Sequence, residues 1–358
     1  MLITAIENFV LFSTLLALAG FALSYVARRA AKNGLWHPRA STLTRLYTAA
    51  LVFPPVTSAW LVMAALLPEF WLGSSGFDAA HPAPLHELHL LSDLTAKLEP
   101  TLGYATVLFI AGVAIFAAWS SVRNFLKVGS VIRRLETTAV QPPAEQVALV
   151  ETIALRRGLA VGLVLSNYPV SFVWGFSRSK LVLSSGLLCT LTAEELTGVL
   201  EHEAAHHERR DNLVKLFLSV CSYSSIAFSM SRVIFGWRAE EVEIVCDEVA
   251  SSRTSAPLEI AEALVKLRRQ TASVMAYAPT GASSFVPQDL PSFELRVHRL
   301  LALADDLQMD GHVASTPQPR INSLLAVAAF FTTSLVLLSL LAPLAVHHAL
   351  ESLIKLVE

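Results

Sequence analysis

The chain has 358 residues, of which 54% are hydrophobic and 16% are charged, and its mean hydropathy is +0.54. Soluble domains carry about a quarter charged residues, so this composition indicates a membrane protein, and the net charge of −2 gives no reason to expect nucleic-acid binding. The odd number and wide spacing of the cysteines favour a reduced, cytoplasm-facing interior over a disulfide framework or a thiolate zinc site: Cys189, Cys221 and Cys246.

Long apolar runs are predicted to cross the membrane as four helices, over about residues 2–26, 46–67, 102–122 and 324–344. The first run has Glu7 as its only early charge and is followed by Arg28 and Arg29. A signal peptide instead carries its positive charge ahead of the apolar stretch. We therefore expect an uncleaved helix that opens an N-terminal membrane region, residues 1–123.

Basic residues orient these spans. Lysines and arginines concentrate in the first connection and after the third span: Arg28, Arg29, Lys32, Arg39, Arg45, Arg123, Lys127, Arg133 and Arg134. The loop 68–101, between the second and third spans, holds one lysine, Lys97, and no arginine. By the positive-inside rule the N-terminus, this loop and the short tail 345–358 lie outside, and the region between the third and fourth spans faces the cytoplasm.

The cytoplasmic region is predicted to hold an α+β domain, residues 124–305, joined by a linker, 306–323, to the fourth span. A helical pattern covers about 140–157, and three short β-like runs follow, over 160–165, 169–174 and 180–183. Thr192 and Glu195 then form a capping box, which opens the next helix.

The capped helix carries the sequence His202-Glu203-Ala204-Ala205-His206, an H-E-x-x-H motif. Residues four apart share a helix face, so both histidines can turn a ring nitrogen toward one metal ion. Glu203 lies about 100° round the helix from His202, within reach of a water on that ion. Zinc with Glu203 as the catalytic base is one interpretation; a polar helix face with two solvated histidines is the other.

A third ligand is expected in an acidic run on a second predicted helix, which begins at Glu240, about thirty-four residues after His206. Catalytic zinc takes three protein ligands, and Glu243 is suited to be the third. Asp247 shares its helix face and can orient a histidine ligand through a hydrogen bond. The alternative is an acidic, solvated helix, against which Cys246 and Ala250 on the same face indicate a packed surface.

The apolar run from Leu213 to Trp237 lies between the two ligand helices. A single membrane crossing there would put Glu243 on the opposite side of the bilayer from the histidines. We therefore expect two helices that meet at a turn near Ser224–Ser229.

These motifs resemble the BlaR/MecR-type integral-membrane zinc metallopeptidases. The resemblance rests on E-L-x-x-V-L-x-H-E-x-x-H-x-x-R-R-D at Glu195–Asp211 and E-x-x-C-D at Glu243–Asp247. Phe172–Leu183 is similar to the family's strand–turn–strand, and Leu295–Leu301 to its R-x-x-R-L-L segment. Unlike the β-lactam-sensing members, the chain is not expected to carry a penicillin-binding sensor domain after its last predicted span.

The resemblance implies a predominantly α-helical protein with a zincin-like (gluzincin) domain embedded in a four-helix transmembrane scaffold. It implies one zinc ion on His202, His206 and Glu243, and endopeptidase activity in a bacterial inner membrane. The substrate would be a protein or peptide, for example a winged-helix transcriptional repressor or the chain itself. Membrane lipid is the other expected partner, and the oligomeric state is left open, with a homodimer as one option.

A peptide substrate is expected to pair with the strand before the motif helix, at Ser171, Phe172 and Val173, because main-chain pairing holds a substrate straight with little demand on its sequence. Two other functions stay open. One is a prenyl-protease or HtpX-like metalloprotease for quality control or processing, which shares H-E-x-x-H and a later glutamate. The other is a non-catalytic membrane receptor or scaffold that retains the fold.

Overall fold

The structure, a computed structural model, describes residues 2–72, 141–175, 179–223, 228–271, 283–284 and 290–310, together with residues 112, 115, 116, 119 and 123. The predicted outer loop lies outside this part beyond residue 72, and so does the predicted third span apart from those single residues. So do the linker, the fourth span and the tail, except for the first residues of the linker.

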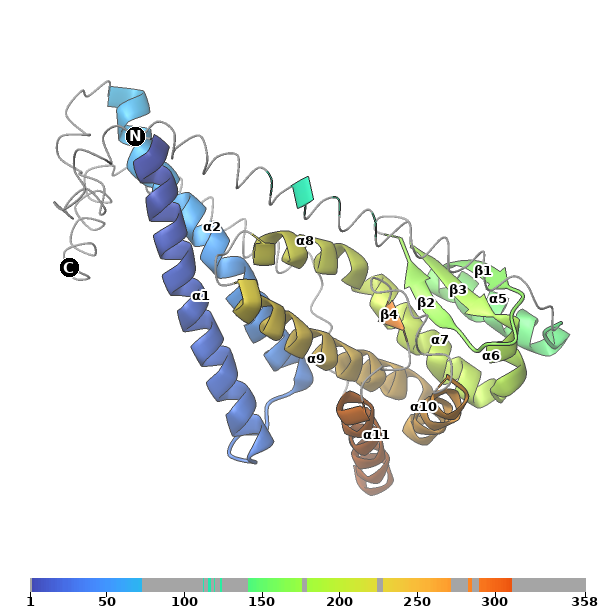
Figure 1. Ribbon diagram of the computed structural model, residues 1–358. Coiled ribbons are helices and arrows are strands. Elements are labelled where there is room, and N and C mark those ends of the chain that lie inside the picture. Colours follow the sequence, from blue (N-terminus) through green and yellow to red (C-terminus); the bar gives the residue numbers. More distant parts are fainter. Residues whose placement is uncertain are drawn as a thin grey trace.

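Two long helices, α1 (Leu2–Lys32) and α2 (Ala40–Leu72), lie side by side at the N-terminus (Figure 1). They contain the helices predicted over 2–26 and 46–67. Close packing occurs at Gly20, where an added Cβ would lie 3.3 Å from the Ala50 carbonyl oxygen. Within the residues that are described, no helix is long and apolar enough to cross a membrane. That these helices span one stays a prediction.

A small mixed sheet follows α5 (Ala144–Arg157). Its strands are β1 (Ala160–Val164), β2 (Ser171–Trp174), β3 (Lys180–Ser184) and β4 (Ser283–Ser284), in the order β1-β3-β2-β4. β1 is parallel to β3, whereas β2 is antiparallel to both of its neighbours. The three predicted strands are confirmed; β4 was not predicted.

After the short helix α6 (Ser185–Thr190), α7 (Ala193–Glu208) begins with the predicted capping box. The Thr192 hydroxyl accepts a hydrogen bond from the Glu195 amide, and the Glu195 carboxylate accepts one from the Thr192 amide. Gly198 lets a later helix, α10 (Pro257–Thr271), approach closely, because an added Cβ would lie 2.6 Å from Ile260. The helix that carries H-E-x-x-H is therefore held in place by the capping box at its start and by α10 at Gly198.

The apolar run after α7 forms two helices, as predicted: α8 (Asp211–Tyr223) and the start of α9 (Phe228–Thr254). A further helix, α11 (Leu290–Asp310), packs on α9 and α10. The main core lies between the sheet and the helices α5, α7, α10 and α11, and includes Leu183, Leu196, Ile260 and Leu300. In Figure 1, α9 runs from the α1–α2 pair toward α7 and α10.

Candidate metal centre

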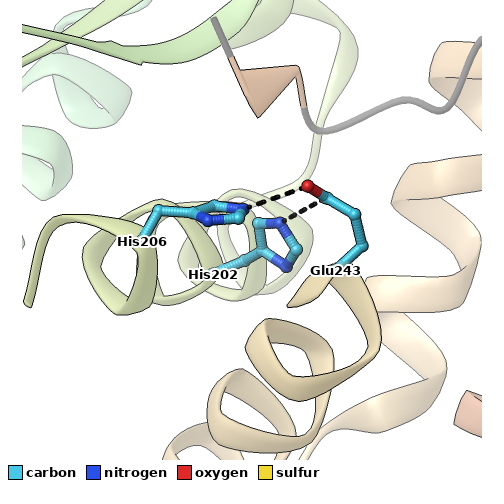
Figure 2. A group of neighbouring side chains, drawn as sticks. All are labelled: His202, His206 and Glu243. Carbon is cyan, nitrogen blue, oxygen red and sulfur yellow. Dashed lines mark ion pairs between the residues drawn. The ribbon is translucent and has the colours of Figure 1, made fainter. Parts of the chain in front are cut away.

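Two helices bring three predicted ligands together (Figure 2). α7 contributes His202 and His206, and α9 contributes Glu243. The Nε2 atom of His202 lies 3.4 Å from Oε2 of Glu243, and Nε2 of His206 lies 3.5 Å from Oε1. Bonds of about 2.0–2.1 Å at tetrahedral angles would place neighbouring zinc ligands about 3.4 Å apart. The three residues therefore fit a zinc ion.

The approach of α7 to α9 follows from small and apolar side chains at their contact. Ala205 of α7 belongs to one buried cluster with Val242, Val245 and Cys246 of α9. These cluster residues are neighbours of the ligands in sequence. Their packing therefore places Glu243 next to the two histidines. The expectation that Cys246 belongs to a packed helix face is confirmed, because its side chain is fully buried.

Each histidine has a carboxylate at its other ring nitrogen. Nδ1 of His202 lies 2.8 Å from Oδ1 of Asp247, the residue predicted to orient a ligand, and Nδ1 of His206 lies 2.8 Å from Oδ2 of Asp211. Such a partner fixes the tautomer and the ring orientation, so that both Nε2 atoms point to one place. Metal-binding histidines usually have this arrangement, which supports the fit to zinc.

Asp211 has a role that the sequence did not show, although it ends the R-R-D element. Its carboxylate also accepts a hydrogen bond of 3.2 Å from Nε of Arg209. Burial alone would raise the pKa of Asp211, but the charge of Arg209 and the hydrogen bond to His206 hold it well below the usual range. The Asp211 side chain therefore stays ionised next to His206.

Glu203 is fully buried beside the ligands. Its Oε1 atom accepts a hydrogen bond of 2.9 Å from the Ser171 hydroxyl, whereas Oε2 has no hydrogen-bond partner among the described residues. Burial raises the pKa of Glu203 above its usual value, against the lowering effect of the two histidines and Ser171. A carboxylate with a raised pKa can both accept and return a proton, as a general base must.

Arg296 was not predicted to belong to the site. Its guanidinium donates two hydrogen bonds of 2.7 Å to Asp247 and one of 3.4 Å to Oε2 of Glu243. Burial alone would lower the pKa of Arg296, but the charges of the two carboxylates raise it, so the guanidinium is ionised. The sequence signal was an arginine inside an otherwise apolar helix stripe.

The strand predicted to bind substrate lies next to the metal centre, but its residues are buried. The side chain of Ser171 contacts Glu203, and Phe172 and Val173 are each 2% exposed. The edge of β2 that faces away from β3 is partly occupied, because Phe172 pairs with Ser284 and Val173 with Ser283. Asn212 donates a hydrogen bond of 2.8 Å to the Val173 carbonyl. At this edge of β2, the place where a substrate would pair is therefore partly taken by β4 of the chain itself.

Comparison with known proteins places this centre in a peptidase. Residues 135–274 match Peptidase family M48. The Protease HtpX homolog of Ralstonia nicotianae is 28% identical over 224 residues, which cover 61% of this chain and 77% of that protein. The Protease HtpX homologs of Ralstonia pickettii and Burkholderia multivorans are each 26% identical over 224 residues, with the same shares.

These findings support the resemblance to BlaR/MecR proteins only in its coarser part, a metallopeptidase with the H-E-x-x-H helix. The matching family is M48, and the similar proteins are HtpX homologs. The matched residues contain both ligand helices, with His202, His206, Glu203 and Glu243. The chain is therefore a metallopeptidase, a hydrolase whose residues 135–274 are similar to family M48.

Proposed function

We propose that the chain is a membrane-bound endopeptidase that uses one zinc ion held by His202, His206 and Glu243. The observation that carries this proposal is the geometry of the donor atoms. Two Nε2 atoms lie 3.4 and 3.5 Å from the two oxygens of one half-buried carboxylate, and the other nitrogen of each ring lies next to a second carboxylate. A scaffold without catalytic function gives no reason for this arrangement to be kept together with a buried base.

A zinc ion held by His202, His206 and Glu243 would supply Lewis-acid chemistry, since it would polarise a carbonyl and lower the pKa of a water to about 7. The residues of the chain do the rest. Oε2 of Glu203 accepts the proton of the attacking water and later returns it to the leaving amine. Ser171 holds Oε1, so that the carboxylate keeps one orientation through both transfers.

The substrate is proposed to be a protein segment that adopts an extended conformation along β2. Main-chain pairing next to Glu203 would align a scissile bond with the metal centre. Since β4 pairs with Phe172 and Val173, the substrate must replace β4 or bind beside it. β4 belongs to the chain itself, so self-cleavage and cleavage of another protein are both compatible with this edge.

Two cellular roles remain candidates. The similarity to HtpX homologs favours a quality-control or processing protease of the membrane. The R-R-D and C-D elements favour regulated proteolysis of a cytoplasmic target, such as a winged-helix repressor, because they resemble the BlaR/MecR pattern. In this structure these elements supply Asp211 and Asp247, the two residues behind the histidines.

We further propose a bacterial inner-membrane location, with four spans, the N-terminus outside and the peptidase domain in the cytoplasm. The support is the apolar composition and the basic residues after the first and third runs. The α1–α2 pair packs directly on α8 and α9, so a membrane-embedded pair would hold the domain close to the bilayer.

The test uses the purified full chain in detergent, with zinc content and cleavage of an unfolded model protein as readouts. The wild type is expected to hold one zinc ion per chain and to cleave. Glu203→Gln should keep the zinc and lose at least about a hundredfold in rate, because the base contributes roughly 10²–10⁴. His202→Ala should lose both. Wild-type cleavage by Glu203→Gln, or a wild-type chain without zinc, would overturn the proposal.

A second measurement separates the two roles. New protein N-termini are compared between cells that express the wild type and cells that express Glu203→Gln. Fragments from many membrane proteins support quality control. A fragment from a single DNA-binding protein supports regulated proteolysis.

A further inference from the structure

A fully buried arginine is unusual in a folded domain, because arginine is almost never buried without a partner. Arg296 is 2% exposed and is among the largest buried side chains of the molecule. It lies on α11, whereas the residues that it contacts lie on α9. The catalytic chemistry described above does not use it.

The acidic residues of α9 explain why a cation is needed there. Glu243 and Asp247 are four residues apart, so their side chains are neighbours on one helix face. Like charges at this spacing repel each other, and burial strengthens the repulsion. Both carboxylates must nevertheless stay ionised, one to bind a metal ion and the other to accept the N–H of His202. A buried cation between them offsets the repulsion.

The contact geometry uses what only an arginine offers. Nε and Nη2 of Arg296 donate to the two different oxygens of Asp247, each at 2.7 Å, in a bidentate pair. Nη1 then points to Oε2 of Glu243 at 3.4 Å. The planar guanidinium therefore fixes the rotation of the Asp247 carboxylate and touches the third ligand as well.

α11 delivers this side chain as part of its packed face. Phe293, Leu300 and Ala304 have the spacing of one helix stripe with Arg296. Leu300 is fully buried in the main core, and Phe293 packs against the same core. Arg296 thus takes a core position of α11, and the packing of the helix determines where the guanidinium lies.

We propose that Arg296 is a positioning residue of the metal centre: through its bidentate contact with Asp247 it sets the orientation of the His202 ring, and through Nη1 it holds Glu243. Docking of α11 thereby completes a site whose ligands all lie on α7 and α9. The inference rests on the proposed zinc site.

The test measures the zinc dissociation constant of the full chain in detergent by competition with a chelating dye. Arg296→Met removes the charge and all three hydrogen bonds, and is expected to weaken zinc binding by about 10–100-fold, the usual cost of losing a residue behind a ligand. Arg296→Lys keeps the charge without the bidentate fork, and should fall between Arg296→Met and the wild type. Arg299→Met, an exposed arginine of the same helix, is the matched control and should change the constant by less than about twofold.

A double-mutant cycle with Asp247→Asn distinguishes positioning from general support of the fold. If Arg296 acts through Asp247, Arg296→Met should weaken zinc binding much less in the Asp247→Asn background than in the wild type. Equal losses in both backgrounds, or a wild-type constant for Arg296→Met, would overturn the inference. If Arg296→Met does not fold, the comparison of Arg296→Lys in the two backgrounds decides in the same way. Failure of the wild type to bind zinc would instead overturn the proposed function.

Discussion

The hydroxyl of Ser171 donates a hydrogen bond of 2.9 Å to Oε1 of Glu203, across the contact between β2 and α7. Both side chains are buried, at 4% and 0% exposure, so water does not compete for this bond. The bond leaves Oε2 as the oxygen that handles the proton. Ser171 therefore acts on the base, whereas the sequence placed it among residues that bind substrate.

Replacement of Ser171 by alanine is expected to lower kcat by about tenfold, since a hydrogen bond to a charged group contributes roughly 1.5–3 kcal/mol. Burial raises the pKa of Glu203 and the Ser171 bond lowers it, so the pKa rises further in the variant. Because the base must be ionised, the loss of kcat/KM on acidification should begin at a higher pH. Zinc content should not change.

The control for this variant is Ser252→Ala, which removes a half-buried hydroxyl that bonds to Val249 of its own helix. It should leave the pH profile of kcat/KM unchanged. An unchanged profile for Ser171→Ala would show that the hydroxyl does not tune the base.

The parts of the site that local spacing determines were accessible from the sequence. His202 and His206 share a face by helix periodicity, the capping box located the start of α7, and Asp247 shares a face with Glu243. The domain pattern of one helix, three strands and the motif helix also follows from local signals. Each of these predictions uses residues that are close together in the sequence and needs no information on contacts with distant residues.

The remaining parts depend on contacts between distant residues. Arg296 is separated by 49 residues from Asp247, and nothing in α11 alone says that its buried arginine meets two carboxylates. β2 is buried on both faces, so it has no alternation of polar and apolar residues that could show which of its side chains face α7. β4 consists of two serines without an apolar pattern, and its pairing with β2 exists only in the folded chain.

Glu201 is expected to stabilise the motif helix. Its fully buried carboxylate contacts Arg156 and Arg157 at 2.7 Å and Arg253 at 3.2 Å, so it joins α7 to α5 and α9. Glu201→Gln removes the charge that these arginines surround. The free energy of unfolding, measured by denaturant titration, should fall by about 2 kcal/mol, less than for a fully buried pair because the arginines are partly exposed.

The comparison for this variant is Glu194→Gln, which changes an exposed glutamate in the first turn of α7. It should cost at most about 0.5 kcal/mol. An equally small loss for Glu201→Gln would mean that the arginine cluster does not hold the helix.

Weakening β4 is expected to speed cleavage of other proteins if substrates pair with β2. Successive N–H groups of a strand point to opposite edges, so replacing both Ser283 and Ser284 by proline removes whichever one bonds to β2. Loss of about 1 kcal/mol of pairing should raise kcat/KM for an unfolded substrate by roughly fivefold. Alanine at both positions keeps the backbone N–H groups and should leave the rate unchanged. A lower rate for the proline variant would mean that β4 supports the site and does not compete for it.

Zinc binding is expected to strengthen as the pH rises, because His206 must lose a proton first. Burial alone would lower the pKa of His206, but the neighbouring acidic groups of Cys246, Glu243 and Asp211 raise it well above the usual histidine value. Below that pKa the metal-free site holds a proton, which the ion must displace. After removal of metal with a chelator, the affinity should therefore rise with pH, by up to about tenfold per pH unit below that pKa. Asp211→Asn lowers the pKa and should flatten this slope, whereas Asp305→Asn, on the exposed side of α11, should not. Equal slopes for the wild type and Asp211→Asn would show that Asp211 does not control the protonation of His206.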